Sequence, residues 1–205
     1  MPKIRFPSRG PAAPQSGEQP AVSDVELVAG LARGEEWAAD MLYDRLQPVV
    51  DRTLRRLLRS GGPDHDDMVQ AAFERIIKVL TERKLSESYD LAAWSSVVAT
   101  RVALDALRRR TRENRLFSAM VDEPERPDGN LERHLEARSE IARVQGVIAR
   151  LRPKYAEALV LHDVLGHDLS EVARLVDVSV SAAQSRLVRG RRELVRRIKG
   201  KSRHE

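Results

Sequence analysis

The sequence predicts an all-α protein made of two small helical domains that are joined by a flexible acidic linker. Three observations support this fold class. Apolar residues recur at helical spacing from Ser23 into the C-terminal region. Proline and glycine interrupt this spacing, and the longest interruption, residues 118–138, is also acidic. The last segments follow the pattern of a helix-turn-helix: a short helix, a tight turn and a long basic helix.

The domain boundaries follow from shifts in composition. We expect a disordered arm at residues 1–22, which contain five prolines, and a first helical domain at residues 23–117. The linker at residues 118–138 contains two prolines and reaches roughly 70 Å when about 20 residues are fully extended. A second helical domain is expected at residues 139–199, followed by a charged tail at residues 200–205.

The composition favours an anionic partner. The 205 residues carry a formal net charge of +5, with a pI near 9.9. The absence of cysteine excludes disulfides and thiolate zinc sites and fits a reducing compartment. No apolar run approaches the roughly 20 residues that cross a bilayer, and the N-terminus lacks the apolar segment of a secretory signal. We therefore expect a soluble cytoplasmic protein without membrane insertion.

Two helices begin the first domain. Ser23 and Glu26 form a capping-box pattern at the start of the first helix. The second is expected over residues 35–60, with an apolar stripe that begins at Trp37. Pro48 is expected to kink or break this helix, because proline lacks the N–H that a helix interior needs.

The third helix is acidic on its exposed side. It begins at Asp64, where further carboxylates in the first turn suit the helix dipole. Its apolar face includes Phe73, and its polar face carries Asp66, Gln70, Glu74 and Lys78. No histidine or third acid follows at the spacing of metal ligands, so no metal site is expected here.

The fourth helix is basic. It follows a polar loop that contains Tyr89 and runs from Leu91 to about Asn114, with Trp94 on the apolar stripe and expected in the core. Arginines occupy most of the remaining surface. Asp105 lies four residues from both Arg101 and Arg109 and is expected to neutralise part of their charge.

The second domain ends in the helix-turn-helix. After a helix near Ser139, Pro153 suits the first turn of another that ends at Gly166. Asp168 and Glu171 form a second capping-box pattern, which begins a short helix. The turn at Asp177-Val178-Ser179 precedes a long helix that carries Arg186, Arg189, Arg191, Arg192, Arg196 and Arg197. Such a second helix enters the DNA major groove, whereas a simple helical hairpin would only expose these arginines to solvent. Their position after the turn favours DNA.

Several segments, in order along the chain, match motifs of one known family. Asp66-Asp67-Met68-Val69-Gln70-Ala71-Ala72-Phe73 is similar to the Asp-x-x-Gln-x-x-Phe helix of bacterial sigma factors, and Ala93-Trp94 through Asp105-Ala106-Leu107-Arg108-Arg109 is similar to the helix that follows it. Glu171-Val172-Ala173 and Ser185-Arg186-Leu187-Val188-Arg189-Gly190-Arg191 resemble motifs of the terminal domain. From about Ser23 to Ile198 the chain resembles the extracytoplasmic-function (ECF) group of the sigma-70 family.

The resemblance implies a promoter-specificity subunit of RNA polymerase, neither an enzyme nor a cofactor-binding protein. Contact with the clamp of the largest polymerase subunit would involve Asp66, Asp67, Gln70, Phe73 and Glu74. Contact with the −10 element, including a flipped base, would involve Lys84, Tyr89, Arg101, Asp105, Arg108 and Arg109. The −35 element would be read by Ser181, Gln184, Ser185, Arg186, Arg189 and Arg192. Further implied contacts are the flap of the second-largest subunit and an anti-sigma factor.

The sequence departs from the family pattern in three places. Arg101 stands where asparagine is usual, and Ser95 replaces the leucine after Trp94. Ser181-Ala182-Ala183-Gln184 replaces the common Gly-Thr-Val-Lys, which removes a hydroxyl and a cation. Each lost phosphate contact lowers the salt slope of DNA binding by roughly 0.9. We therefore expect an unusual promoter, or −35 binding that depends on the arginines.

Three other functions compete with this interpretation. A dimeric helix-turn-helix regulator would act on palindromic operators without docking on polymerase. A metal-dependent phosphohydrolase would use His162-Asp163 and His167-Asp168, but Gly166 separates these pairs and the capping pattern already explains Asp168. An adaptor would use its basic faces to bind acidic protein partners.

Overall fold

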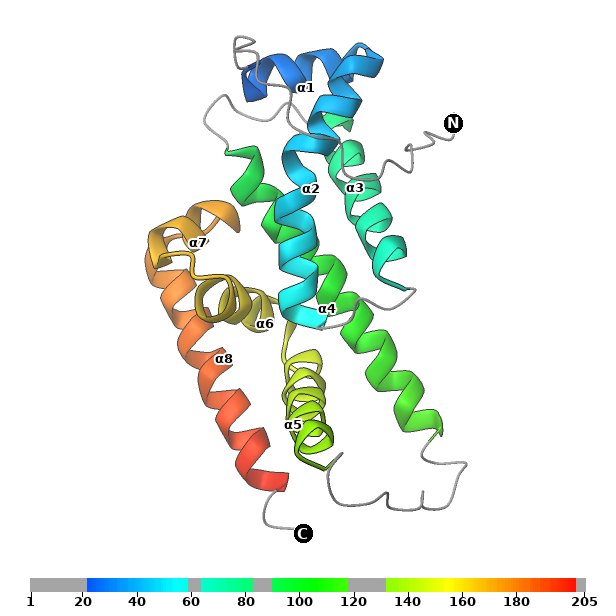
Figure 1. Cartoon of the computed structure of the whole chain (residues 1–205). Helices are drawn as coiled ribbons and strands as arrows, with labels where there is room; N and C mark the ends of the chain where they lie inside the picture. Colours follow the sequence, from blue (N-terminus) through cyan, green and yellow to red (C-terminus); the bar gives the residue numbers. More distant parts are fainter. Residues whose placement is uncertain (1–21, 59–63, 83–89, 118–131, 202–205) are drawn as a thin grey trace.

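The computed structural model describes residues 22–58, 64–82, 90–117 and 132–201, and within these ranges the chain is helical and contains no strand. The all-α prediction is therefore confirmed (Figure 1). The N-terminal unit consists of α1 (Asp24–Ala32), α2 (Glu36–Leu58), α3 (Asp64–Glu82) and α4 (Leu91–Phe117). The C-terminal unit consists of α5 (Glu132–Ala149), α6 (Pro153–Leu159), the π-helical turn η1 (Val160–Val164), α7 (Leu169–Leu175) and α8 (Val180–Lys201). None of the described helices is long and apolar enough to span a membrane.

The start of α1 has the predicted capping box. The backbone N–H of Glu26 donates to Ser23 Oγ at 3.2 Å, and the backbone N–H of Ser23 donates to Glu26 Oε2 at 2.9 Å. Of the two outcomes expected at Pro48, a kink or a break, the break is absent, because α2 continues through the proline. Leu46 and Val50, on either side of the proline, are fully buried, so the core holds both halves of α2.

Side chains of α2, α3 and α4 form the core of the N-terminal unit. The Phe73 ring lies 4.6 Å from the Tyr43 ring, centroid to centroid, and Trp94 is buried as predicted. Trp37, predicted on the apolar stripe, is instead 43% exposed, and its indole N–H donates to Glu35 Oε2 at 2.8 Å. A Cβ on Gly30 would lie only 2.8 Å from atoms of the α2 side chains, so the crossing of α1 over α2 requires glycine there.

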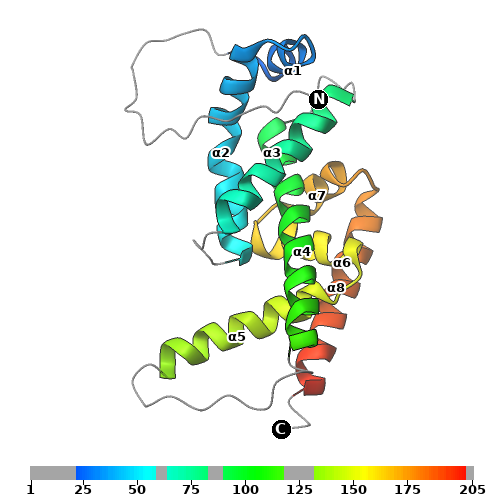
Figure 2. The ribbon, with the colours of Figure 1, turned by 90° about the vertical axis from the view of Figure 1, so that its right-hand side faces the viewer.

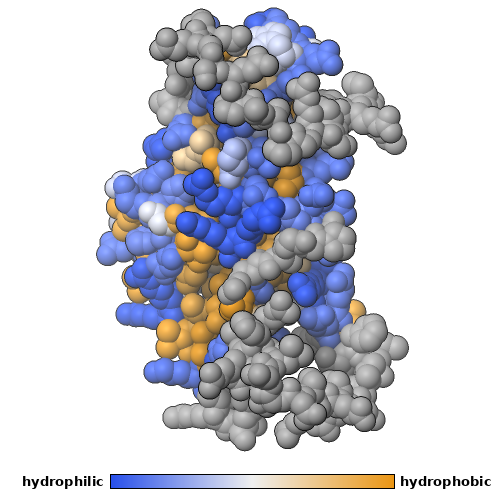
Figure 3. Space-filling view, in the orientation of Figure 1, coloured by the Kyte–Doolittle hydropathy of each residue, from blue (hydrophilic) through white to orange (hydrophobic). Residues whose placement is uncertain are grey.

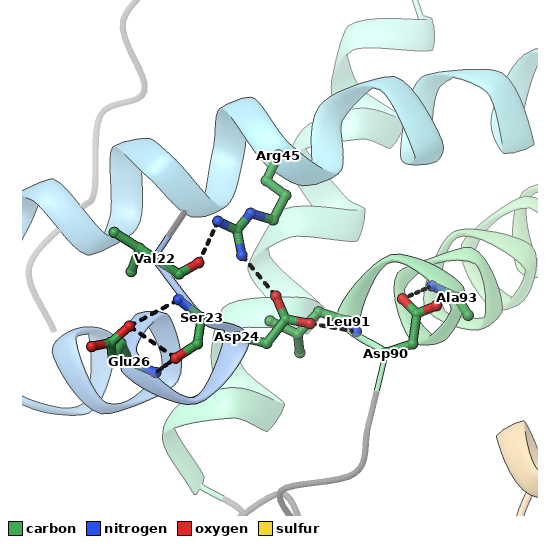
Figure 4. Close-up of polar contacts among 8 residues, drawn as sticks. All are labelled: Val22, Ser23, Asp24, Glu26, Arg45, Asp90, Leu91 and Ala93. Carbon is green, nitrogen blue, oxygen red and sulfur yellow. Dashed lines mark hydrogen bonds and ion pairs between the residues drawn. The ribbon is translucent and has the colours of Figure 1, made fainter. Parts of the chain in front are cut away.

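A polar network fixes the start of α4 against the first two helices (Figure 4). Asp24 accepts a hydrogen bond from Arg45 Nη1 at 2.7 Å and another from the backbone N–H of Leu91 at 3.1 Å. Asp90 caps the same helix by accepting from the N–H of Ala93 at 3.0 Å. The carboxylates occupy the end of α4 where free N–H groups favour negative charge.

The helix-turn-helix forms where the sequence predicts it, with one difference. The backbone N–H of Glu171 donates to Asp168 Oδ1 at 2.8 Å, but the Glu171 carboxylate lies 3.0 Å from His167 Nδ1, so this helix start has a side-chain cap in place of the predicted reciprocal box. Asp177 has φ +52°, the left-handed turn conformation that aspartate tolerates. Ser179 Oγ accepts from the N–H of Ala182 at 3.2 Å and caps α8.

The predicted linker is partly helical. Helix α5 begins at Glu132 rather than near Ser139, so residues 132–138 belong to a helix and not to a structureless tether. These residues follow Gly129, the last helix breaker of the segment, and include good helix formers. Residues 118–131 lie outside the described part of the chain.

The two units pack against each other along α4 (Figures 1 and 2). One apolar cluster contains residues of both units, and polar contacts surround it. Arg101 Nε donates to Glu157 Oε1 at 2.6 Å, and Ser96 Oγ lies 3.1 Å from His167 Nε2. In this arrangement the described parts of the two units are in direct contact.

Candidate nucleic-acid and protein interfaces

One exposed face of α3 carries most of the residues expected to contact polymerase. Asp66, Asp67, Gln70 and Glu74 are exposed, and Gln70 Nε2 donates to Glu74 Oε1 at 3.1 Å. Phe73 does not belong to this surface, because it is 1% exposed and packs in the core. Phe73 lies three residues after Gln70 and seven after Asp66, so it borders the acidic face, but its ring is turned into the core against Tyr43.

His65, one residue after the start of α3, is buried. Its Nε2 atom lies 2.7 Å from Oδ1 of Asp51 in α2. Burial raises the pKa of the Asp51 carboxyl, but hydrogen bonds from Arg55 and His65 outweigh it and hold that pKa below its usual value. This pair connects α3 to α2 behind the exposed acidic face.

The histidine–aspartate pairs of the C-terminal unit do not form a metal site. Within the described ranges no group of three or more histidines, aspartates or glutamates is arranged to hold a metal ion. His167 lies against Glu171, and Asp163 accepts a hydrogen bond from Arg191 Nε at 2.9 Å. These partners leave the phosphohydrolase interpretation without its metal ligands.

The basic face of α4 has different ion pairs from those that helical spacing predicts. Asp105 accepts from Arg75 Nη1 at 3.0 Å and from Arg108 Nη1 at 3.1 Å, and its predicted pairing with Arg101 and Arg109 is wrong. Tertiary neighbours explain the change, because Arg75 of α3 lies beside Asp105, and Arg101 pairs with Glu157 of α6, as described above. Arg109 is exposed. The predicted −10 contacts Lys84 and Tyr89 lie outside the described residues.

The predicted −35 contacts lie on the solvent side of α8. Exposed members of the set are Ser181, Gln184, Ser185, Arg189 and Arg192, and Arg186 is half-buried. The opposite side of the helix, at Ala183 and Leu187, is buried against the unit. An exposed second helix of this kind fits the dimensions of a major groove.

Val188 is a candidate contact that the sequence analysis missed. Figure 3 shows apolar surface over α6 and the lower part of α8. The exposed large apolar side chains of α8 are Val180, Val188 and Val195. Val188 is 37% exposed and lies four residues from both Gln184 and Arg192, so it shares their face. Counting this spacing within the predicted recognition helix would have identified it.

Two contacts set the position of α8 on the rest of its unit. A Cβ on Gly190 would lie 3.0 Å from the carbonyl oxygen of Tyr155, so glycine permits the close crossing of α8 over α6. Arg191 forms a two-pronged ion pair with Asp163 of η1. Hydrogen bonding from Arg191 holds the pKa of the Asp163 carboxyl below its usual value, although burial opposes this shift.

Comparison with known proteins identifies both units. The family models described as Sigma-70 region 2 and Sigma-70, region 4 match residues 42–113 and 141–194, together more than half of the chain. The RNA polymerase sigma factor CarQ of Myxococcus xanthus is 29% identical over 168 residues, which cover 78% of this chain and 89% of CarQ. The ECF RNA polymerase sigma factor SigM of Mycobacterium tuberculosis is 28% identical over 174 residues, which cover 85% of this chain and 84% of SigM.

This chain is also similar to a solved structure, that of CnrH in complex with the cytosolic domain of CnrY. The two chains share 23% sequence identity and a TM-score of 0.49, and the match covers 86% of this chain and 97% of that chain. The region 2 match includes α3 and α4, and the region 4 match includes the helix-turn-helix. The chain therefore belongs to the ECF group of the sigma-70 family, whose members bind RNA polymerase and recognise promoters.

Proposed function

We propose that this sigma factor reads the −35 element with α8, contacts and melts the −10 element with α4 and the preceding loop, and docks on polymerase through α3. The observation that carries the proposal is the exposed face of α8, which presents hydroxyl, amide and guanidinium groups directly after the capped turn of a helix-turn-helix. Groups of these types hydrogen-bond to base edges and to phosphates.

At the −35 element we assign base reading to the first half of α8. Gln184 and Ser185 are exposed within the first two turns of the helix, where a recognition helix meets base edges. Arg189, one turn further, is assigned to a phosphate, because the family's usual lysine is replaced by Gln184 and its contribution must come from another cation.

At the −10 element we assign phosphate contacts to Arg101, Arg108 and Arg109, and the pocket for a flipped base to Lys84 and Tyr89. Extruding a base costs a few kcal/mol, and stacking on an aromatic ring returns part of that cost. A guanidinium at position 101 suits a phosphate better than the amide of the usual asparagine does.

We assign polymerase docking to the exposed acidic face of α3, which would contact the clamp of the largest polymerase subunit. No ion pair within the described residues neutralises Asp66, Asp67 or Glu74, so these carboxylates are available to a basic partner surface. The C-terminal unit is assigned to the flap of the second-largest subunit. An anti-sigma factor with acidic surfaces would silence the protein by covering α4 and α8.

Run-off transcription with purified core polymerase on genomic DNA, followed by mapping of the start sites, tests this function. We expect a new set of start sites that share −10 and −35 sequences. Arg189→Ala should weaken use of these promoters, and most strongly at low salt, because salt already weakens the phosphate contact that the change removes. Binding to palindromic operators without any association with polymerase would instead support the dimeric regulator.

A further inference from the structure

An arginine-lined hollow lies between the α5–α6 junction and the second half of α8. Its volume is about 620 Å³. Its lining consists of Arg150, Leu151, Arg152, Tyr155, Arg189, Arg192, Glu193, Arg196 and Arg197. Neither Arg150, Arg152 nor Arg196 is among the residues assigned to promoter reading above.

The hollow has an excess of unpaired positive charge. Its one carboxylate, Glu193, is occupied by Arg197, whose Nη2 lies 2.6 Å from Glu193 Oε1. Arg150, Arg192 and Arg196 are exposed, and no ion pair is formed by them within the described ranges. Like charges on adjacent helical turns, as at Arg192 and Arg196, destabilise a helix. An anionic ligand removes that repulsion.

The floor of the hollow is formed by buried side chains. Tyr155 is 7% exposed, and Leu151 is also buried. The Tyr155 hydroxyl accepts a hydrogen bond from Arg189 Nη1 at 3.4 Å, and Arg152 lies 6.0 Å from the centre of the Tyr155 ring. Arg152 and Arg189 therefore contact the same buried aromatic ring from two segments, which cross closely at Gly190.

The position of the hollow along α8 indicates which anion it binds. Ser185 and Arg196 are eleven residues apart, which corresponds to about 16 Å along a helix at ~1.5 Å per residue. The major groove is about 12 Å wide. When the first half of α8 lies in the groove, the hollow therefore lies beyond the groove edge, where a phosphate backbone runs. Guanidinium groups bind phosphate oxygens through paired hydrogen bonds.

We propose that this hollow clamps the phosphodiester backbone of the DNA duplex beside the −35 element, with Arg150 and Arg196 as its main contacts. The proposal rests on the promoter-reading function of α8 and adds a contact that carries no base information. It predicts a gain in affinity that is the same for every promoter sequence and that salt weakens.

The test is the salt dependence of promoter binding by holoenzyme reconstituted with wild-type protein, Arg150→Gln, Arg196→Gln or the double variant. Arg52→Gln, at an exposed arginine of α2 outside the hollow, is the charge-matched control. Each hollow variant should lower the slope of log K against log salt by about 0.9, and the double variant by about 1.8. Start sites should not change, and thermal melting checks that each variant is folded.

The outcomes separate the two proposals. If wild-type holoenzyme directs specific starts but the slopes of the hollow variants equal that of Arg52→Gln, the hollow does not contact DNA and only this inference fails. If wild-type protein directs no starts, the proposed function fails and the inference fails with it. A third measurement is titration of the protein with inorganic triphosphate. If the hollow binds triphosphate but the hollow variants do not change the salt slope of promoter binding, the hollow is a site for a small phosphorylated ligand, and the DNA assignment is wrong.

Discussion

Individual residues show where helical spacing predicts a contact and where it does not. Phe73 belongs to a motif that resembles a polymerase-docking helix, yet its ring is buried against Tyr43. Asp105 has Arg101 and Arg109 one turn away on either side, yet it pairs with Arg75 of another helix and with Arg108. Spacing along one helix predicts which side chains share a face, but it does not include competitors from neighbouring helices.

Val188 provides a prediction at the residue scale. Its exposed isopropyl group lies on the proposed reading face of α8, where an apolar contact suits the methyl group of thymine. Val188→Ser should reduce the preference for thymine at one −35 position by roughly 1 kcal/mol, the lower end of the cost of a mismatched base pair. Competitive binding of −35 variants by holoenzyme measures this. Val195→Ser, two turns further along, is the control, and an equal effect of both changes would contradict a specific contact.

The start and end of single helices depend on a few local sequence features, which can be recognised without knowledge of tertiary contacts. The Ser23 capping box forms as predicted, and Ser179 caps α8 directly after the predicted turn. The turn between α7 and α8 depends on Asp177, whose φ of +52° is unfavourable for most side chains.

Changing Asp177 tests how far this turn determines the helix-turn-helix. A β-branched side chain in the left-handed region costs roughly 1–2 kcal/mol, so Asp177→Val should lower the free energy of unfolding by about that amount. Asp177→Gly should be neutral or stabilising, because glycine adopts this conformation without a steric penalty. Denaturant unfolding of both variants measures the difference. Equal stabilities of the two variants would show that the turn is not strained.

The pair between η1 and α8 predicts a pH dependence. The pKa of Asp163 is lowered by hydrogen bonding from Arg191, so the pair stabilises the folded state above about pH 4, near the unfolded pKa. This stabilisation is lost as the pH falls through the lower folded pKa. Asp163→Asn should therefore reduce the Tm at neutral pH and make the decline of Tm on acidification less steep than in wild type.

Thermal melting between pH 7 and pH 3 checks this expectation. Asp40→Asn is the matched control, because Asp40 is exposed and no ion pair of the described residues includes it. Parallel Tm profiles for wild type and Asp163→Asn would contradict a role for this pair in acid stability.

At the scale of the whole molecule, the two units form a joint core along α4 (Figure 2). Arg101, a proposed −10 contact, is 52% exposed but paired with Glu157, which is 12% exposed. If Arg101 binds a phosphate, this pair must break. Promoter binding through Arg101 would then compete with the packed arrangement of the two units.

Glu157→Gln tests this competition. Loss of the charged partner should favour separation of the units, by up to about fivefold in their equilibrium, since an ion pair whose guanidinium is half in solvent contributes roughly 0–1 kcal/mol. The chain contains no cysteine, so dyes attached through Lys78→Cys in α3 and Arg174→Cys in α7 report the separation by energy transfer. Glu140→Gln, which removes an ion pair within α5, is the control. An unchanged dye distance in Glu157→Gln would contradict a role for the pair.

The sequence alone determined the helical class, the helix starts at Ser23 and Asp168, the position of the turn at residues 177–179 and the family motifs. These features depend on residues within a few positions of each other, so local physical rules predict them. Tertiary structure decided which charges pair, that Phe73 is buried and Trp37 exposed, and that the units pack together. It also brought Arg150 and Arg196 to one hollow. The reason is distance: these contacts join residues far apart in the chain, and only the packing of helices brings them within reach.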